Sequence, residues 1–309
     1  MRALVTGGSG YLGSHVCKRL KQEGWDVVVY DIKNPKHEYA DLFCQADIRD
    51  RNELDFLLDK VKVDVVFHFA GRIEVGESVK IPTEFYDVNT GGTCNLLNVM
   101  VKHDVKNIIY SSTAAVYRTV DYELDEYDEV QYKTNAYAGS KLSAEYAIQQ
   151  SGLNHIIFRY FNLAGADSDG EMGEDHDPET HLIPKIIQNL NNVEVYGHDY
   201  PTTDGTCVRD YVHVCDVAEA HLNAAKYLIE GNVSIILNLG TGKGYSVNKI
   251  ITLIEKVAGR KIDIKYLSRR PGDPSKLVAN VNLAKKVLKY RPKHDIMSIL
   301  QTAYDWHTK

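Results

Sequence analysis

The fold of this chain is decided by its opening stretch, Ala3-Leu4-Val5-Thr6-Gly7-Gly8-Ser9-Gly10-Tyr11-Leu12-Gly13. An apolar run leads directly into glycines at positions 7, 10 and 13, and a helical pattern begins at Tyr11. In a turn between a strand and a helix, glycines let the backbone approach a pyrophosphate closely, and the unpaired N–H groups of the helix N-terminus bind its charge. The stretch therefore predicts a dinucleotide-binding turn, with an ordinary glycine-rich turn as the alternative.

Outward from this turn, short apolar runs alternate with longer helical patterns through the first half of the chain. Strands are predicted at residues 3–5, 27–30, 65–69, 108–110 and 156–159. Helices are predicted at residues 11–23, 52–61, 83–103 and 136–150. Such alternation is typical of βαβ units that build a parallel sheet. The sequence therefore predicts an α/β fold with a doubly wound parallel sheet of the Rossmann type.

The regular alternation ends near residue 165, which predicts a division of the chain. Residues 1–165 are expected to form the dinucleotide-binding Rossmann domain, and residues 166–309 mainly a smaller α/β lobe that binds a ligand. Residues 215–240 contain a helical pattern at 218–229 and a strand pattern at 235–239. These two elements are expected to return to the main sheet.

Charge and composition exclude several classes of protein. The 309 residues include 36 Lys and Arg against 42 Asp and Glu, for a formal net charge of -6. A polyanion requires a local basic patch and the sequence has none, so binding to nucleic acid or to an anionic membrane is not expected. No apolar run approaches the ~18 residues of a membrane span, and the strand at the N-terminus leaves no room for a signal peptide. We expect a cytoplasmic protein.

The cysteines and histidines do not indicate a metal site. The five cysteines form no CxxC pair. Cys17 and Cys94 fall within apolar helical patterns and are interpreted as buried thiols in a reducing compartment. His176 and His181 lack the spacing of paired metal ligands, so they are interpreted as solvated loop histidines, and no metal is predicted.

Carboxylates and small residues at predicted strand ends indicate the kind of dinucleotide. Asp31 ends the second predicted strand, where a carboxylate can accept both hydroxyls of an adenosine ribose and would repel a 2′-phosphate. This position favours NAD over NADP. Asp47 with Ile48, and the run Phe69-Ala70-Gly71, supply further positions of the kind that line an adenine and its ribose.

A tyrosine and a lysine in the last helix of the first half form a candidate catalytic pair. Tyr137 begins this helix, and a spacing of four places Lys141 on the same helix face, where its charge favours the phenolate. Thr113 follows the strand at 108–110, where a hydroxyl can share a proton with a substrate and the phenolate. A phenol with its ordinary pKa of about 10 is a poor base at neutral pH. Lys141 and a positive nicotinamide ring are expected to lower the pKa of Tyr137. A second Tyr-x-x-x-Lys pair, Tyr245 and Lys249, lies outside the cofactor half and is interpreted as chance.

The glycine turn, Thr113, Tyr137 and Lys141 together resemble the extended short-chain dehydrogenase/reductase family. Longer matches run to about residue 280 and narrow the resemblance to members that epimerise UDP-hexoses. These matches are Val75-Gly76-Glu77-Ser78, Arg159-Tyr160-Phe161-Asn162, residues 169–174, residues 199–206 with Arg209-Asp210-Tyr211-Val212-His213-Val214, and Arg269-Arg270-Pro271-Gly272-Asp273. The resemblance implies tightly bound NAD, and reversible C4 epimerisation of UDP-galactose and UDP-glucose through a 4-keto intermediate. It also implies a homodimer built on the helices at 83–103 and 136–150.

Carried over position by position, the resemblance implies three groups of site residues. Tyr137, Lys141 and Thr113 are the catalytic residues. The cofactor contacts are Gly7, Gly10, Tyr11, Leu12, Gly13, Asp31, Asp47, Ile48, Phe69, Ala70, Gly71, Asn89, Ser111, Tyr137, Lys141 and Tyr160. Substrate contacts are Leu182 and Tyr196 for the uracil, Asn162, Arg209 and Arg270 for the diphosphate, Asp273 for the uridine ribose, and Thr113 for the sugar. For Arg209 and Arg270, a structural ion pair is the alternative.

Some positions depart from the family pattern. Ile73 stands where several members carry a lysine that touches the cofactor, and the neighbouring Arg72 is a candidate to compensate for its loss. Leu277 stands where side-chain bulk is thought to decide whether an N-acetylated sugar fits, and a residue of intermediate size leaves this open. Ala114-Ala115 follow Thr113 where related dehydratases and decarboxylases carry acidic residues, which argues against both activities. A catalytically silent NAD-binding regulator is the other alternative, and the presence of both Tyr137 and Lys141 argues against it.

Overall fold

The computed structural model describes residues 1–132, 135–270 and 272–309, so Pro271 of the match at 269–273 lies outside the described residues. The chain divides into two compact units. Unit 1 consists of Met1–Val116, Val130–Arg159 and Ala218–Leu237, and unit 2 of Tyr117–Glu129, Tyr160–Val217 and Asn238–Lys309. The assignment of a cofactor domain and a substrate lobe to particular residue ranges stays a prediction.

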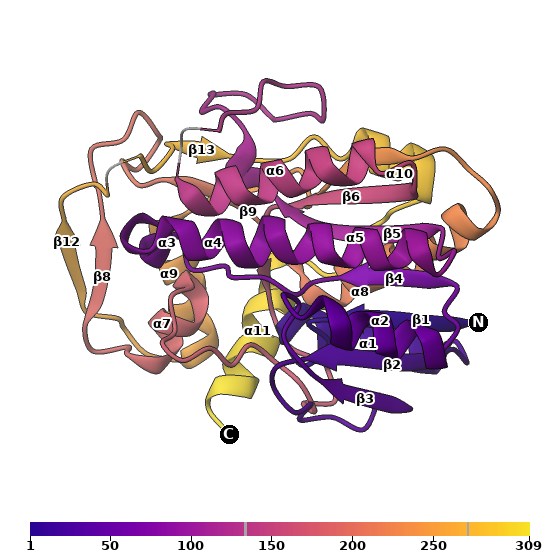
Figure 1. Ribbon diagram of the computed structural model, residues 1–309. Helices are drawn as coiled ribbons and strands as arrows, with labels where there is room; N and C mark the ends of the chain where they lie inside the picture. Colours follow the sequence, from indigo (N-terminus) through magenta and orange to yellow (C-terminus); the bar gives the residue numbers. More distant parts are fainter. Residues whose placement is uncertain (133–134, 271) are drawn as a thin grey trace. The chain divides into compact units, whose positions relative to one another are not determined.

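A seven-stranded sheet organises unit 1, in the order β10-β6-β5-β4-β1-β2-β3. Figure 1 labels this sheet from β6 to β3. Its strands are β1 (Arg2–Thr6), β2 (Asp26–Asp31), β3 (Leu42–Gln45), β4 (Val65–His68), β5 (Asn107–Thr113), β6 (Asn154–Tyr160) and β10 (Ile235–Leu239). The ladders that join β5, β4, β1, β2 and β3 are all parallel. Every residue of β4 is buried, as expected for a strand covered on both faces. The predicted doubly wound parallel sheet is confirmed.

Helices pack against this sheet, and two of them are capped by side chains. Asp50 caps α2 by accepting hydrogen bonds from the N–H groups of Asn52 and Glu53, and Asn135 caps α6 by accepting one from Ala138. The second cap fixes the start of α6, so Tyr137 lies in its first turn. The helices and helical turns are α1 (Tyr11–Gln22), α2 (Arg51–Lys60), α3 (Val75–Lys80), α4 (Pro82–Phe85), η1 (Tyr86–Gly91), α5 (Gly92–Lys102), η2 (Ala114–Val116), α6 (Ala136–Gln150) and α8 (Val214–Ile229).

Unit 1 differs from the sequence prediction in several details, including helix α3, which was not predicted. The helix predicted at 83–103 is interrupted by the π-helical turn η1, which carries Asn89. The buried Asn89 side chain bonds the backbone of Arg72 and the hydroxyl of Ser140, and π turns are frequent where a helix presents a functional side chain. Strand β3 was not predicted, because its four residues lie at the sheet edge and none of them is fully buried.

Unit 2 is built from short strands and four helices among its described residues. Strand β9 (Val208–His213) pairs with β7 (Asn162–Ala164), β11 (Gly244–Ser246) and β13 (Lys276–Leu277), while β8 (Val193–Tyr196) pairs with β12 (Ile264–Leu267). The helices are α7 (Leu182–Gln188), α9 (Val247–Ala258), α10 (Asn282–Leu288) and α11 (Ile296–His307). Isoleucines and leucines of α7, α9 and α11 form its main apolar core.

The buried carboxylate of Asp210 is a polar anchor within unit 2. It accepts hydrogen bonds from the backbone of Thr241, Gly242 and Ala279, and from the Thr241 hydroxyl. These bonds tie β9 to the segments that follow β10 and β13. A buried carboxylate with this many donors holds neighbouring chain segments together.

All five cysteines are free, and Cys17 is buried as predicted. Cys94 is only half-buried, so the prediction for that thiol was wrong. Its side chain lies on the less enclosed face of α5, which an apolar pattern alone does not distinguish. Among the described residues, no helix has both the length and the apolarity needed to cross a bilayer.

Candidate active site

The glycine turn leaves the start of α1 open to an anion. Gly7 has φ +73°, and a Cβ on Gly13 would lie 2.2 Å from the carbonyl oxygen of Gly7. Both positions therefore require glycine. Gly10 caps α1 without a side-chain hydrogen bond, and no acidic residue lies in the first turn, which includes Tyr11 and Leu12. Backbone donors and the helix dipole at this end favour a phosphate group.

Other residues predicted to line an adenosine lie at the ends of β2 and β4, the strands on either side of β1. The Asp31 carboxylate accepts hydrogen bonds from the backbone N–H groups of Ser9 at 3.0 Å and Lys33 at 2.9 Å. Phe69 and Ala70 both donate backbone hydrogen bonds to the carbonyl of Thr6, which seats the end of β4 beside the glycine turn. The backbone thus brings Asp31 and the run from Phe69 to the turn where the first helix starts.

Asp47 and Ile48 follow β3 and play different parts. Arg49 donates to the Asp47 carboxylate, with Nη2 at 2.6 Å from Oδ2, and this interaction lowers the pKa of Asp47. Ile48 is buried in the apolar core of unit 1. Asp47 is held as a carboxylate at the surface, while Ile48 presents apolar surface next to Gly92 of α5.

Three predicted cofactor residues meet around the lysine of α6. Lys141 is buried, and its Nζ donates to the carbonyl of Ser111 at 2.9 Å. A Cβ added at Gly71 would lie 2.8 Å from Asn89 Oδ1 and 3.3 Å from Lys141 Nζ. The ends of β4, β5 and η1 therefore converge on Lys141, and a side chain at position 71 would displace Asn89 or Lys141.

Tyr137 and Thr113 form the proposed proton-transfer pair. Thr113 ends β5 and its hydroxyl accepts the Ala115 N–H at 3.1 Å. Burial raises the pKa of Tyr137, the neighbouring Thr113 side chain lowers it, and the charge of Glu74 raises it, with a net upward shift. The sequence predicts that Lys141 and a positive nicotinamide ring together lower this pKa, and that stays a prediction. In the chain alone, burial outweighs the effect of Thr113, and the Lys141 amine is bonded to Ser111.

The environment of Lys141 includes a buried ion pair that was not predicted. Burial lowers the pKa of Lys141 to about 8, and the charge of Glu145 opposes this shift. Glu145 lies one turn further along α6 and is fully buried, with Arg159 Nη2 at 2.7 Å from its Oε2 and the Ser112 hydroxyl donating to Oε1. The sequence signal that could have indicated Glu145 was its spacing, because Tyr137, Lys141 and Glu145 follow one another at intervals of four residues.

Arg72 and Ile73 lie close to this group. The Arg72 guanidinium forms an ion pair with Glu84 and lies 5.3 Å from the centre of the Phe85 ring. The charge predicted to compensate for the absent lysine at Ile73 is therefore already paired within the chain.

Unit 2 brings the predicted UDP residues together in pairs. Arg209, at 9 % exposure, donates to the Asp273 carboxylate. The Arg270 guanidinium lies over the Tyr196 ring, 4.0 Å from its centre. Arg209 thus has the ion pair that was the alternative interpretation, while Arg270 stacks on an aromatic ring instead.

The remaining predicted positions of unit 2 are also placed by its strands and helices. Asn162 starts β7, paired in register with Tyr211, and Leu182 is the first residue of α7. Leu277 lies on β13 in register with Arg209. Tyr160, predicted to contact the cofactor, ends β6 and is buried.

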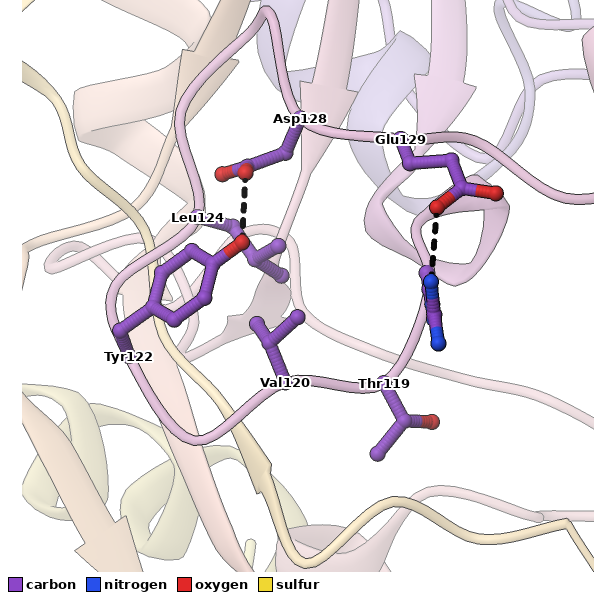
Figure 2. A pocket seen from close by; sticks show the side chains of 7 residues that line it. Thr119, Val120, Tyr122, Leu124, Asp128 and Glu129 are labelled. Carbon is purple, nitrogen blue, oxygen red and sulfur yellow. Dashed lines mark hydrogen bonds and ion pairs between the residues drawn. The ribbon is translucent and has the colours of Figure 1, made fainter.

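Figure 2 shows a pocket of about 190 Å³ in unit 2 that is separate from all these residues. It is lined by part of the loop from Arg118 to Glu129, where Tyr122 donates to Asp128 at 2.8 Å and Arg118 pairs with Glu129 at 2.9 Å. None of the predicted site residues lines it. The pocket therefore does not bear on the candidate active site.

The glycine turn and the group of Thr113, Tyr137 and Lys141 define a class of proteins. Comparison with known proteins identifies this class. Residues 3–240 match the NAD dependent epimerase/dehydratase family, and the chain belongs to that family. Within it, the chain is similar to proteins named UDP-glucose 4-epimerase, which confirms the resemblance inferred from the motifs. The relative from Rhizobium meliloti is 44% identical over 317 residues, covering 99% of this chain and 97% of that protein, and the one from Lacticaseibacillus casei is 43% identical over 320 residues, covering 99% and 97%.

Solved structures agree with this placement. A UDP-glucose-4-epimerase from Stenotrophomonas maltophila with bound NAD and formylated UDP-arabinopyranose has a TM-score of 0.94 at 36% identity, covering 100% of this chain and 98% of that one. A UDP-glucose 4-epimerase from Bifidobacterium longum in complex with NAD+ and UDP has a TM-score of 0.91 at 35% identity, with coverage of 100% and 98%.

Proposed function

We propose that this protein interconverts UDP-galactose and UDP-glucose by reversible epimerisation at C4, with NAD as its tightly bound cofactor. The observation that carries the proposal is the constellation of unit 1, where the Thr113 side chain neighbours Tyr137 and Lys141 lies beside Asn89 and Gly71. The similarity to epimerases over the full chain supports it.

The chain's own residues fit NAD. The open N-terminus of α1 and the glycines at 7, 10 and 13 suit a pyrophosphate, and the Asp31 carboxylate suits an unphosphorylated adenosine ribose. Gly71 leaves space next to Lys141 that any other side chain would occupy. When bound, NAD takes up a hydride from C4 of the sugar and returns it.

In the proposed reaction, Tyr137 acts as the general base that accepts the proton of the 4-hydroxyl, directly or through Thr113. Lys141 contacts the nicotinamide ribose, and below pH 8 it carries a positive charge on the same helix face as Tyr137. Because the residues of the chain alone raise the pKa of Tyr137, the phenolate depends on this charge together with that of the oxidised nicotinamide. Tyr137 then returns the proton when the 4-keto sugar has turned its other face to the hydride donor.

We infer that unit 2 holds the UDP portion. Arg209, Arg270 and Asn162 are assigned to the diphosphate, because guanidinium groups bind phosphates with paired, charge-assisted hydrogen bonds. Leu182 and Tyr196 are assigned to the uracil, and Asp273 to the uridine ribose. Charged residues are thus assigned to the nucleotide and none to the hexose, which leaves the 4-keto sugar free to turn over between the two hydride transfers.

We also propose that the protein is a cytoplasmic homodimer. Exposed apolar side chains on the two helical segments predicted to form the dimer support this assembly, namely Tyr86 at 39%, Val101 at 57% and Tyr146 at 47% exposure. Light scattering measures the mass directly, and a mass of 34.8 kDa in solution would contradict the dimer.

The test is to incubate the purified protein with UDP-galactose without added cofactor and to separate the products. An equilibrium mixture with UDP-glucose is expected. If no product forms, the assay is repeated with NAD, because Ile73 replaces a cofactor contact of several family members. Failure under both conditions would refute epimerisation of these two sugars. A dehydratase would instead yield a deoxy-keto product, which the Ala114-Ala115 pair after Thr113 argues against.

A further inference from the structure

The loop of unit 2 that precedes α7 gathers four side chains that the proposed reaction does not use. Glu174, His176, Glu179 and His181 each offer one ligand atom, and these atoms all lie within 4.8 Å of one another. His176 and His181 were predicted to be solvated loop histidines. The His181 side chain is 46% exposed and fits that interpretation, whereas His176 is half-buried; both rings contact the buried carboxylate of Glu174.

The contacts converge on two glutamates. His176 Nδ1 lies 3.2 Å from Glu174 Oε1 and 3.8 Å from Glu179 Oε2, and His181 Nδ1 contacts the same oxygen of Glu174. The side chains of Glu174 and Glu179 are only 4% and 7% exposed. Two buried carboxylates this close require positive charge between them.

A second observation points to a ligand within this group. Glu179 Oε1 accepts hydrogen bonds from the backbone N–H groups of Thr180 and His181, whereas Glu179 Oε2 is buried and has no hydrogen-bond partner among the described residues. A buried carboxylate oxygen without a donor is costly unless a cation supplies the missing interaction.

The backbone of the cluster is fixed from outside. The Trp306 indole of α11 donates to the carbonyl of Glu174 at 2.9 Å, and a Cβ on Gly173 would lie 2.4 Å from the same ring. The next residue after His181 is Leu182, the first residue of α7. A ligand in the cluster would therefore join the loop to α7 without rearrangement of α11.

We propose that Glu174, His176, Glu179 and His181 bind a divalent transition-metal ion, with Zn²⁺ as the best match. Two imidazole nitrogens and two carboxylate oxygens are a donor set that Zn²⁺ accepts, and ligand atoms about 2.0–2.2 Å from a tetrahedral ion lie roughly 3.3–3.6 Å apart. The longer separations, at most 4.8 Å, need only a small contraction, whereas His181 Nδ1 and Glu174 Oε1, which are in direct contact, move apart to admit the ion. Because four protein ligands complete the coordination shell, the ion holds the loop and does not activate water.

The experiment uses the full chain without a polyhistidine tag, freed of metal with a chelator. Zn²⁺ is titrated by competition with a metal indicator, and Co²⁺ is titrated by visible absorption, because tetrahedral Co²⁺ absorbs far more strongly than octahedral Co²⁺. One site per chain with the strong tetrahedral Co²⁺ spectrum is expected. Added Zn²⁺ should also raise the melting temperature of the chain.

Two variants and one control test the assignment to this cluster. His181→Ala and Glu179→Gln should each weaken Zn²⁺ binding at least about tenfold and remove the Co²⁺ spectrum. His198→Ala changes an exposed histidine of the same unit and should leave binding unchanged. Near-UV circular dichroism of the metal-free variants checks that each is folded. Equal Zn²⁺ affinity in the wild type and both variants, or no Zn²⁺ binding by the wild type, would overturn the proposal. Neither result would affect the proposed epimerase activity, which is measured separately.

Discussion

The candidate catalytic residues of unit 1 and the candidate UDP residues of unit 2 are held in place in different ways. Thr113, Tyr137 and Lys141 lie on β5 and α6, whose regular backbone fixes their positions, and Thr113 and Lys141 are also buried. In unit 2, Arg209 is held by the side chain of Asp273, and Arg270 by stacking on Tyr196. Side-chain pairs of this kind can exchange one partner for a phosphate or a ribose hydroxyl, whereas the backbone-fixed group cannot rearrange. Changes in unit 1 should therefore alter turnover, and changes in unit 2 should alter substrate affinity.

The largest expected effect comes from removing the phenol of unit 1. Tyr137→Phe deletes the general base, so kcat for UDP-galactose should fall by about 10³-fold or more, while bound NAD and the melting temperature stay close to the wild type. Tyr245→Phe, in the second Tyr-x-x-x-Lys pair, is the matched control and should keep full activity. Substantial epimerisation by Tyr137→Phe would contradict the assignment of Tyr137 as the general base.

In unit 2, the expected effect is on KM. Arg209→Met removes a guanidinium assigned to the diphosphate, and a charge-assisted hydrogen bond of about 1.5–3 kcal/mol corresponds to an increase in KM of roughly 10- to 150-fold. The kcat should change little. Arg269→Met is the control, because Arg269 pairs with Asp199 and has no assigned role in binding. A fall in kcat at unchanged KM would contradict the division of roles between the two units.

The same contrast explains how far the sequence predicts the molecule. The glycine turn and the strands and helices of unit 1 were predicted because buried regular elements leave a periodic pattern of apolar residues. The UDP residues of unit 2 follow only from the resemblance, because Arg270 and Asp273 lie outside strands and helices and no periodicity marks them.

Other features escaped prediction because they depend on packing. The ion pair between Glu145 and Arg159 is buried, although charged residues in a pattern are assigned to the surface by default. The raised pKa of Tyr137 follows from burial that spacing does not reveal. His176 and His181 were set aside because their spacing matches no familiar metal motif, and Glu174 and Glu179 were not considered, yet a loop can gather residues at irregular spacing.

A smaller effect tests the burial of Lys141. Its pKa of about 8 in the folded chain lies below its ordinary value of 10.5, so between these pH values the unfolded chain binds more protons and the free energy of unfolding should rise with pH. Below pH 8 the burial costs at most about 3 kcal/mol, and the hydrogen bond to Ser111 offsets about 1 kcal/mol of that. Lys141→Met should therefore lose activity without losing stability at pH 7.

Denaturant unfolding of wild type and Lys141→Met from pH 7 to pH 10.5 measures this difference. The wild type should gain stability relative to the variant as the pH rises. Equal pH dependence of the two proteins would show that Lys141 titrates normally in the folded chain.

The smallest expected effect tests how much of unit 2 can rearrange its side-chain contacts. Either the whole unit can do so, or only the part that holds the UDP residues. The buried Tyr117 hydroxyl donates to Asn238 Oδ1 at 2.7 Å, and Asn238 Nδ2 donates to the carbonyl of Leu124 at 3.0 Å, so a fixed polar chain runs through this unit as well. Tyr117→Phe leaves a buried acceptor without its donor and should lower the free energy of unfolding by about 1–2 kcal/mol, with KM unchanged. Tyr127→Phe, at 86% exposure, is the control and should have no effect. An increase in KM for Tyr117→Phe would instead mean that the interior of unit 2 adjusts together with its binding residues, and the contrast between the two units would then be one of degree.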